Sequence, residues 1–345
     1  MAIKDIGIGI IGCGRIARGV HLPAYRTAGY KVVAAAEVRQ DALDEVRSTF
    51  NIPHLYTDYQ ELLKRDDVQV VDVAVPSPQH VEVATEVVKA GKHAWVQKPF
   101  SYSLAGVRKL VALAKRRGVI LGVNQNSNWA PGFVVAKKFL DAGFIGEPFL
   151  CTIENRNLVD ITDRYYKDLD RFVIIEMAIH HIDLVRHWFG DPAYVYATAT
   201  KDPVQAMKGE KSAFITLEYK SAMRVLLIED WSMRGSKEDA HPMEKIVVDG
   251  TKGRIVAKSE WVEVYSERLP SPPTGTAKGV FRPAVQGKWF PDAFGASMGE
   301  MLSAVAEGRQ PLTSGADNIR SLQVVFAAYK SIEQKRAVRP SEIQG

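Results

Sequence analysis

The chain has 345 residues, which is enough for two domains of ordinary size and too many for one small core. Hydrophobic residues make up 46% and charged residues 25%, values of a folded protein that exclude a disordered or fibrous chain. The formal net charge of +5 is mild and the basic residues are spread along the sequence, so we expect no nucleic-acid partner.

Cysteine content and hydropathy indicate the compartment. The two cysteines, Cys13 and Cys151, have no closely spaced metal-binding partner and exclude a disulfide framework. The first apolar run is too short and too rich in glycine for a signal peptide. No apolar stretch approaches the ~20 residues that a membrane span needs. We therefore expect a cytoplasmic protein with no membrane partner.

From residue 5 to about 123, short apolar runs alternate with amphipathic helical patterns. The predicted strands are Ile6–Ile11, Val32–Ala36, Val70–Val75, Ala94–Val96 and Val119–Val123. The predicted helices are Arg15–Thr27, Asp41–Thr49, Gln79–Ala90 and Leu104–Arg117. Continuous Val, Ile and Ala runs between helices are typical of a doubly wound parallel α/β sheet covered on both faces.

After about residue 125 strand patterns dominate. Helical patterns remain at Val134–Ala142, Ile174–Trp188, Asp292–Glu307 and Ala316–Lys335. The predicted strands are Pro148–Glu154, Ala193–Thr200, Ala213–Tyr219, Met223–Trp231, Lys245–Asp249, Arg254–Ala257 and Trp261–Tyr265. Short connections predict a mostly antiparallel sheet, and residues 270–288 read as an irregular loop. We therefore expect one domain over 1–124 and an α+β domain over 125–345, whose last helix packs back on the first domain.

A glycine motif marks the nucleotide-binding end. The segment Gly12-Cys13-Gly14-Arg15-Ile16-Ala17 follows a predicted strand and opens a predicted helix, the context that gives G-x-G-x-x-G/A its meaning. Gly12 permits the tight turn, Gly14 lets the pyrophosphate approach the backbone, and Ala17 lets helix and strand pack closely. The N–H groups at the helix start then face the phosphates. A glycine turn in another α/β fold is the alternative.

Two further segments complete the predicted cofactor site. Glu37 ends the second predicted strand about 20 residues after the motif, where a carboxylate accepts hydrogen bonds from ribose hydroxyls and disfavours a 2′-phosphate. We therefore predict NAD, with NADP as the alternative if Arg39 reaches a phosphate. Pro76, Ser77 and His80 follow another buried strand at the same edge of the sheet, and are expected to contact the cofactor.

Together with later segments, these motifs resemble the Gfo/Idh/MocA oxidoreductases, of the glucose–fructose oxidoreductase and inositol dehydrogenase type. The resemblance implies a Rossmann domain followed by an open-faced sheet domain for substrate binding, paired face to face in homodimers or homotetramers. It also implies substrates that are sugars, polyols or their derivatives. The segments that carry it are Gly12–Ala17, Pro76–His80, Ala90–His93, Gln97–Pro99, Asp141–Pro148, Ile179–Asp183 and Gly250–Gly253.

Lys98 is the first predicted catalytic residue. It follows an apolar strand and precedes Pro99, so its side chain is expected to project from the carboxyl end of the sheet toward the nicotinamide. Burial and the cationic ring would lower its pKa, which suits proton transfer and the binding of a hydroxyl. The family usually has Glu-Lys-Pro here. Gln97 replaces the acid, which keeps hydrogen bonding near the cofactor and removes the charge.

The second predicted catalytic group is Glu176 with His180. On an α-helix Glu176, His180 and Asp183 share one face, and a carboxylate beside a histidine fixes its tautomer and raises its basicity. The family has Asp where Glu176 stands, and its glycine-rich approach to the helix is replaced by residues 170–174. Two alternatives are a buried polar network and a divalent metal site. We predict no metal.

The remaining predicted pocket residues suit a hydroxyl-rich ligand through amides and ring stacking. They are Asn126, Asn128, Trp129, His181 and Asp183, with Arg156, Arg164, Tyr165 and Trp289 as weaker candidates. The sequence thus predicts an NAD-dependent dehydrogenase in which His180 takes the hydroxyl proton, Glu176 orients His180 and Lys98 steadies the oxyanion. A non-catalytic sensor of the same fold is the competing class. An enzyme that shuttles hydride between two sugars on a tightly held cofactor is a further variant.

Overall fold

The computed structural model describes residues 2–157, 165–204, 207–232, 244–269 and 280–344. Residue contacts divide this chain into two compact units. The first comprises 1–126 and 290–319, and the second comprises 127–289 and 320–344. The predicted loop over 270–288 lies largely outside the described residues.

The first unit is built on a six-stranded parallel sheet with the order β3-β2-β1-β4-β5-β6. This order confirms the predicted doubly wound sheet, and its switch point lies between β1 and β4. Residues of β1, β4 and β6 are all buried, because helices cover both faces. The strands are β1 (Ile8–Ile11), β2 (Val32–Ala36), β3 (His54–Tyr56), β4 (Val70–Val73), β5 (His93–Gln97) and β6 (Leu121–Asn124).

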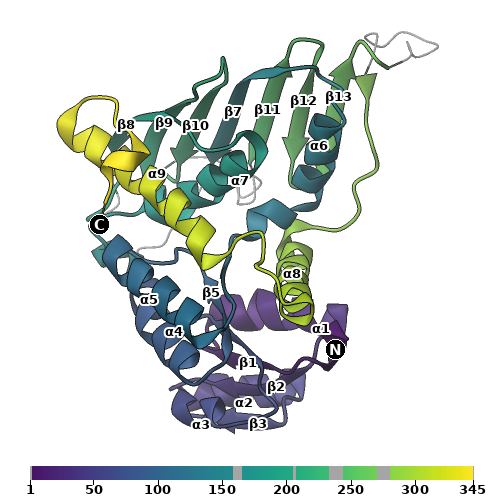
Figure 1. The fold of residues 1–345 in the computed structure, drawn as a ribbon, viewed down its shortest axis with the longest axis vertical. Helices are drawn as coiled ribbons and strands as arrows, with labels where there is room; N and C mark the ends of the chain where they lie inside the picture. The colour runs from purple at the N-terminus through teal and green to yellow at the C-terminus, as the bar shows by residue number, and fades with distance from the viewer. Residues whose placement is uncertain (1, 158–164, 205–206, 233–243, 270–279, 345) are drawn as a thin grey trace. The chain divides into compact units, whose positions relative to one another are not determined.

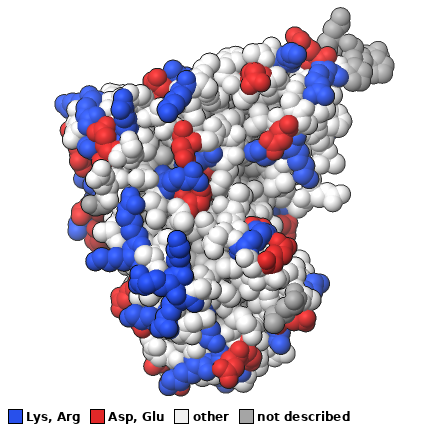
Figure 2. Space-filling view, in the orientation of Figure 1, with Lys and Arg blue, Asp and Glu red and all other residues white. Residues whose placement is uncertain are grey.

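Helix α5 of the first unit begins and ends at the residues that the sequence indicates. Helix α5 starts after Ser103, whose side chain accepts a hydrogen bond from the Gly106 amide, and it ends at Gly118 with a φ of 65°. Figure 1 shows α4 and α5 side by side, and Lys and Arg side chains gather over them in Figure 2. The helices are α1 (Leu22–Ala28), α2 (Gln40–Phe50), α3 (Tyr59–Leu63), α4 (His80–Lys89), α5 (Leu104–Arg117) and α8 (Phe294–Glu307).

The second unit is built on an eight-stranded sheet with the order β14-β13-β12-β11-β7-β10-β9-β8. Its pairs are antiparallel except β10 with β7, which is parallel, so the predicted mostly antiparallel sheet is confirmed. The strands are β7 (Pro148–Arg156), β8 (Tyr194–Thr200), β9 (Ser212–Glu218), β10 (Arg224–Asp230), β11 (Lys245–Gly250), β12 (Gly253–Lys258), β13 (Trp261–Ser266) and β14 (Val280–Phe281).

One face of this sheet is covered by helices. Helices α6 (Pro131–Asp141), α7 (Ile179–Phe189) and α9 (Gly315–Gln334) lie on the same side in Figure 1. Alternation along β9 follows from this: Ala213, Ile215 and Leu217 are fully buried, whereas Phe214 is 48% exposed on the other face. Among the described residues, the helices lack the length and the apolar composition of a membrane span.

Candidate active site

The glycine motif begins directly where β1 ends. Gly12 has a φ of +92°, and a Cβ there would lie 2.7 Å from backbone atoms of Ala74. A Cβ on Gly14 would meet no described atom within 4 Å. The fold itself therefore requires glycine at position 12, whereas the missing side chain at position 14 leaves open space. Open space beside exposed backbone is what the pyrophosphate of a dinucleotide needs at this position.

The helix after the motif starts with a wider turn than predicted. Residues Ala17–His21 form a π-helical turn before α1, and the Arg18 amide donates to the Gly14 carbonyl over 3.0 Å. Arg15 and Ile16 are exposed at its start, while Ala17 is buried in the apolar cluster with Ile10. The helix start after the motif is thus exposed at Arg15 and Ile16, and the start of a helix is where its N–H groups can bind phosphate.

Glu37 stands at the end of β2, beside the glycine motif. One carboxylate oxygen accepts the Cys13 amide over 2.9 Å, and the other accepts the Arg39 amide over 3.1 Å. Burial is the main cause that raises the pKa of Cys13 to about 12, and the negative charge of Glu37 adds to it, so this thiol stays protonated. The Arg39 side chain is exposed and lies 3.6 Å from Asp41. A fixed carboxylate here favours ribose hydroxyls over a 2′-phosphate.

The segment after β4 is held by His80. Its Nδ1 lies 2.7 Å from the Pro99 carbonyl oxygen, and its Nε2 lies 2.9 Å from that of Val75. His80 is 1% exposed, and burial lowers its pKa to about 4 against the opposing effect of the two carbonyls. A neutral imidazole carries one N–H and donates to only one of these carbonyls, while the ring lies between the loop after β4 and the chain after β5. Pro76 and Ser77, predicted cofactor contacts, lie within the loop that it holds.

Lys98 directly follows β5, as predicted. Its amide donates to the Gln97 side-chain oxygen over 2.7 Å, and the peptide bond to Pro99 is cis. The Gln97 side-chain nitrogen lies 3.0 Å from Nε2 of His21, and Nδ1 of His21 lies 2.7 Å from the Asp72 carboxylate. Sequence reasoning did not single out His21 or Asp72. The available signal was an acid within the apolar run of β4.

His180 occupies the first turn of α7 in the second unit. Its side chain is 6% exposed and packs edge-on against Trp289 at a ring distance of 6.1 Å. The helical spacing differs from the prediction, because Ile174–Ala178 form a π turn in which the Ile179 amide bonds to the Ile174 carbonyl. The prediction of one regular α-helix over 174–188 is therefore wrong in its first turn. Glu176, in this turn, is 2% exposed.

His181 is turned toward the sheet. Its Nδ1 lies 2.5 Å from the carboxylate of Glu229 on β10, whose other oxygen accepts the Asn155 side-chain amide over 2.7 Å. All three side chains are fully buried. Burial alone lowers the pKa of His181, but the Glu229 carboxylate outweighs it and the pKa is raised overall. The structure thus places His181 in a buried polar network that ties α7 to the sheet.

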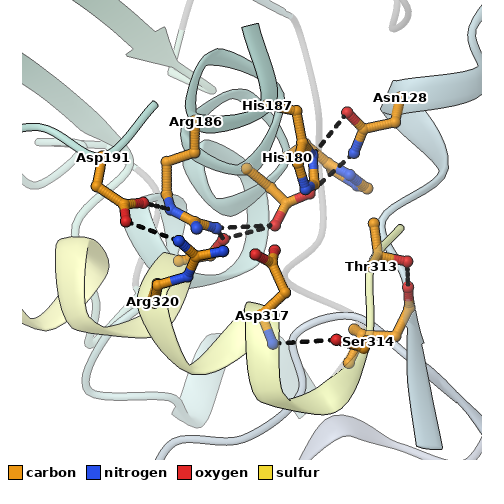
Figure 3. Close-up of polar contacts among 12 residues, drawn as sticks. Asn128, His180, Arg186, His187, Asp191, Thr313, Ser314, Asp317 and Arg320 are labelled. Carbon is orange, nitrogen blue, oxygen red and sulfur yellow. Dashed lines mark hydrogen bonds and ion pairs between the residues drawn. The ribbon is translucent and has the colours of Figure 1, made fainter. Parts of the chain in front are cut away.

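The Asn128 side chain points toward His187 in Figure 3, and Asp183 is bonded to the same amide. The fully buried Asp183 accepts the Asn128 side-chain amide over 2.8 Å and the Ser321 hydroxyl over 2.5 Å. The Asn128 oxygen lies 3.1 Å from Nδ1 of His187. Behind them, Arg186 and Arg320 both contact the Asp191 carboxylate, at 2.7 and 2.9 Å. Asp183 thereby fixes the orientation of the Asn128 amide.

The other predicted pocket residues divide between the two units. Asn126 is 2% exposed in the first unit, and its side-chain amide donates to the Asn124 carbonyl over 3.3 Å. Trp129 is half-buried in the second unit. Among the weaker candidates, Trp289 is buried against His180, Arg156 is exposed near Asp230, and Arg164 lies outside the described residues.

A doubly wound parallel sheet with an open glycine loop at the end of β1 is the architecture of a dinucleotide-binding domain. Comparison with models of protein families supports the same class of protein. Residues 6–125 match the NAD-binding Rossmann fold of an oxidoreductase family, and residues 137–339 match the C-terminal alpha/beta domain of the same family. The chain therefore belongs to the Gfo/Idh/MocA oxidoreductase family.

Relatives with assigned activities align over nearly the whole chain. A D-apiose dehydrogenase of Paraburkholderia graminis is 29% identical, over 99% of this chain and 92% of that protein. A myo-inositol 2-dehydrogenase of Thermotoga maritima is 27% identical, over 98% and 99%. Among solved structures, an oxidoreductase from Agrobacterium radiobacter in complex with NAD+, L-tartaric acid and magnesium superposes with a TM-score of 0.88 at 24% identity, over 99% of this chain and all of that one. That likeness confirms the fold.

Proposed function

We propose that this protein is an NAD-dependent dehydrogenase acting on a secondary or hemiacetal hydroxyl of a sugar, polyol or sugar derivative. The observation that carries the proposal is the position of Lys98, which leaves β5 at the carboxyl edge where the glycine loop of β1 also ends. Ligands of open α/β sheets bind at that edge. Two aligned relatives are named D-apiose dehydrogenase and myo-inositol 2-dehydrogenase, which supports a hydroxyl-rich substrate.

The proposed chemistry is removal of a hydride and a proton from one CH–OH group. Bound NAD supplies the hydride acceptor. His180 accepts the hydroxyl proton, and the Lys98 ammonium donates a hydrogen bond to the oxygen as its negative charge grows. Glu176 is the proposed partner that orients His180. Asn128, with its amide oriented by Asp183, and Trp129 supply hydrogen bonds and a ring face to the substrate.

A spectrophotometric screen tests this function. Purified protein is mixed with NAD and each of a panel of aldoses, ketoses and inositols, and the absorbance of the reduced cofactor is followed. With a substrate found, Lys98→Met is expected to lower kcat by about 10²–10⁴, while NAD still binds in a calorimetric titration. Lys89→Met, an exposed lysine on α4, is the matched control and keeps full turnover.

Two outcomes contradict the proposal. Full turnover in Lys98→Met would remove Lys98 from the mechanism. Binding of NAD and of a sugar without turnover across the whole panel would favour the sensor class instead. Cofactor retained through purification would point to hydride shuttling between two sugars.

We also propose that the open face of the eight-stranded sheet pairs with the same face of a second copy. From β8 to β12, residues that are direct partners on neighbouring strands form a row across this face, and none of them is charged. Tyr196 and Phe214 are 45% and 48% exposed on it. Exposed aromatic side chains beside an uncharged row on a solvated sheet face indicate an interface. The row consists of Tyr196, Thr216, Leu226, Thr152, Val247 and Val256.

Light scattering after size exclusion tests the pairing. The native protein is expected to elute as a dimer or tetramer, and the double variant Tyr196→Lys/Phe214→Lys as a smaller species. Leu312→Lys, which changes an exposed apolar residue of the first unit, is the control and leaves the mass unchanged. A monomeric native protein would contradict the proposal.

We propose a cytoplasmic location as well. Both cysteines are buried thiols, and burial raises the pKa of each. Free buried thiols suit a reducing compartment. Fractionation of cells that express the tagged protein tests this, and recovery from an oxidising compartment would contradict it.

A further inference from the structure

A polar network runs through the first unit beneath Lys98. Asp72 lies in the middle of β4 and is fully buried. Its Oδ2 accepts the Tyr25 hydroxyl over 2.7 Å and lies 2.7 Å from Nδ1 of His21. Burial is the main cause that raises the pKa of Tyr25 well above its ordinary value, and the Asp72 charge adds to it. The hydroxyl therefore keeps its proton and donates. The carboxylate is therefore an acceptor for both neighbours.

The other end of the network has a fixed direction too. The Gln97 side-chain oxygen accepts the Lys98 amide over 2.7 Å, so the side-chain NH2 group is the part that faces His21. That nitrogen lies 3.0 Å from Nε2 of His21. An amide NH2 only donates, so Nε2 must offer a lone pair, while Nδ1 carries a proton toward Asp72. The heavy-atom positions thus assign a neutral His21 with its proton on Nδ1.

The surroundings of His21 leave the ring little freedom. The side chain is fully buried, with the ring of Phe294 at 5.0 Å and that of Tyr25 at 5.9 Å. In such a place every hydrogen bond matters, because a buried polar group left unbonded keeps its full desolvation penalty. A ring rotated or protonated differently would break the bond to Gln97 or the bond to Asp72.

We propose that His21 is a positioning residue for Lys98, and that Asp72 sets the tautomer on which this depends. The unprotonated Nε2 of His21 holds the Gln97 amide, and the Gln97 oxygen holds the backbone of Lys98 where β5 ends. The role assigned to Lys98 rests on the proposed function. The hydrogen-bonded chain itself can be tested without turnover.

The proposal explains why glutamine suits position 97 in this chain. With glutamate there, carboxylates would face both nitrogens of one imidazole, and both are satisfied only when the ring carries two protons and a positive charge. With Gln97, the network contains one carboxylate and a neutral ring. The residue type at position 97 therefore decides the protonation state of His21.

Nitrogen NMR of the imidazoles is the first test. Protein labelled with ¹⁵N-histidine contains eight histidines, and the His21→Phe variant identifies the signals of His21. The wild type is expected to show a protonated Nδ1 and an unprotonated Nε2. Gln97→Glu is expected to show two protonated nitrogens. Asp72→Asn/Gln97→Glu moves the carboxylate to the other end of the ring, and is expected to give a neutral ring protonated at Nε2. A wild-type proton on Nε2 would overturn the proposal.

Kinetics is the second test, and it distinguishes positioning from a merely structural role. His21→Phe fills the same space without a nitrogen and is expected to lower kcat about 10- to 100-fold, the range for a misplaced catalytic group, with NAD affinity changed much less. Gln97→Glu, which keeps the acceptor for the Lys98 amide, is expected to retain more kcat than Gln97→Leu. The matched control is His93→Phe at the opposite end of β5, where Nδ1 accepts the Ile120 amide over 2.9 Å.

The outcomes of these tests separate the positioning role of His21 from the proposed dehydrogenase function. If His93→Phe lowers stability without lowering kcat while His21→Phe lowers kcat, the positioning role holds. Wild-type kcat in folded His21→Phe would refute it. If the wild type turns over no sugar or polyol, the proposed function fails, and the NMR series still decides whether the predicted tautomer exists.

Discussion

The pH dependence of folding stability should report His80 directly. Its pKa is about 4 in the folded protein and about 6.5 in an unfolded chain, so between these values the unfolded state binds more protons. Stability from keeping His80 neutral is therefore fully present above pH ~6.5 and is lost as the pH falls toward ~4. The two pKa values correspond to about 3 kcal/mol at most.

The measurement is urea unfolding of the wild type and of His80→Gln at several values between pH 7 and pH 4. Other groups titrate in this range, including His181, whose raised pKa gives stability that is lost as the pH rises. Their effects cancel in the difference between the two proteins. We expect the advantage of the wild type to shrink by about 2–3 kcal/mol on acidification. Both ring nitrogens lie near carbonyl oxygens, which would favour a charged ring. An advantage that stays constant or grows at low pH would show that the carbonyls outweigh burial.

Three further predictions concern the cofactor loop and the buried network of α7. Gly12→Ala should destabilise the protein by about 2–4 kcal/mol, because it adds a Cβ against backbone at a positive φ, whereas Gly14→Ala should leave urea unfolding nearly unchanged and weaken NAD binding in calorimetry. Comparable loss of stability in both variants would contradict the distinction. Glu37→Ala should reduce the preference for NAD over NADP measured by their dissociation constants, and an unchanged ratio would remove Glu37 from cofactor choice. Glu229→Gln should cost about 1–3 kcal/mol at pH 6 and less at pH 9, because the raised pKa of His181 stabilises the fold only while that ring is charged; equal costs at both pH values would refute the pair.

The first unit was largely predictable because its strands are buried on both faces. Such strands appear as continuous apolar runs, and Val32–Ala36 and Leu104–Arg117 have the bounds that the sequence indicates. The short edge strand β3 and helix α3 were not predicted, since all three residues of β3 are only half-buried and give no apolar run. The π turns at Ala17–His21 and Ile174–Ala178 were also missed, because hydrophobic periodicity does not distinguish a single wide turn from an α-helical one.

The other differences between the sequence-based prediction and the structure come from contacts between residues far apart in the chain. Residues 290–319, which include α8, group with the first unit, whereas the sequence placed one boundary after residue 124 and expected the last helix to pack back on the first domain. The contacts responsible, such as Ser297 with Asn124 at 2.8 Å, join residues far apart in the sequence and leave no local pattern. The residues of the candidate site also divide into those with a local sequence pattern and those brought together by long-range contacts. Glu37 and Lys98 end apolar strands and were predicted, while the pairing of His21 with Asp72 depends on the fold.

The most direct test of the central claim follows the transferred hydrogen. A sugar or polyol that reduces NAD in the screen is prepared with deuterium on the reacting carbon, and the reduced cofactor is analysed by mass spectrometry. The account predicts a cofactor heavier by one deuterium, together with a rate that depends on Lys98 and His180. A deuterium lost to solvent, or a panel with no substrate that reduces NAD, would contradict direct hydride transfer by this protein.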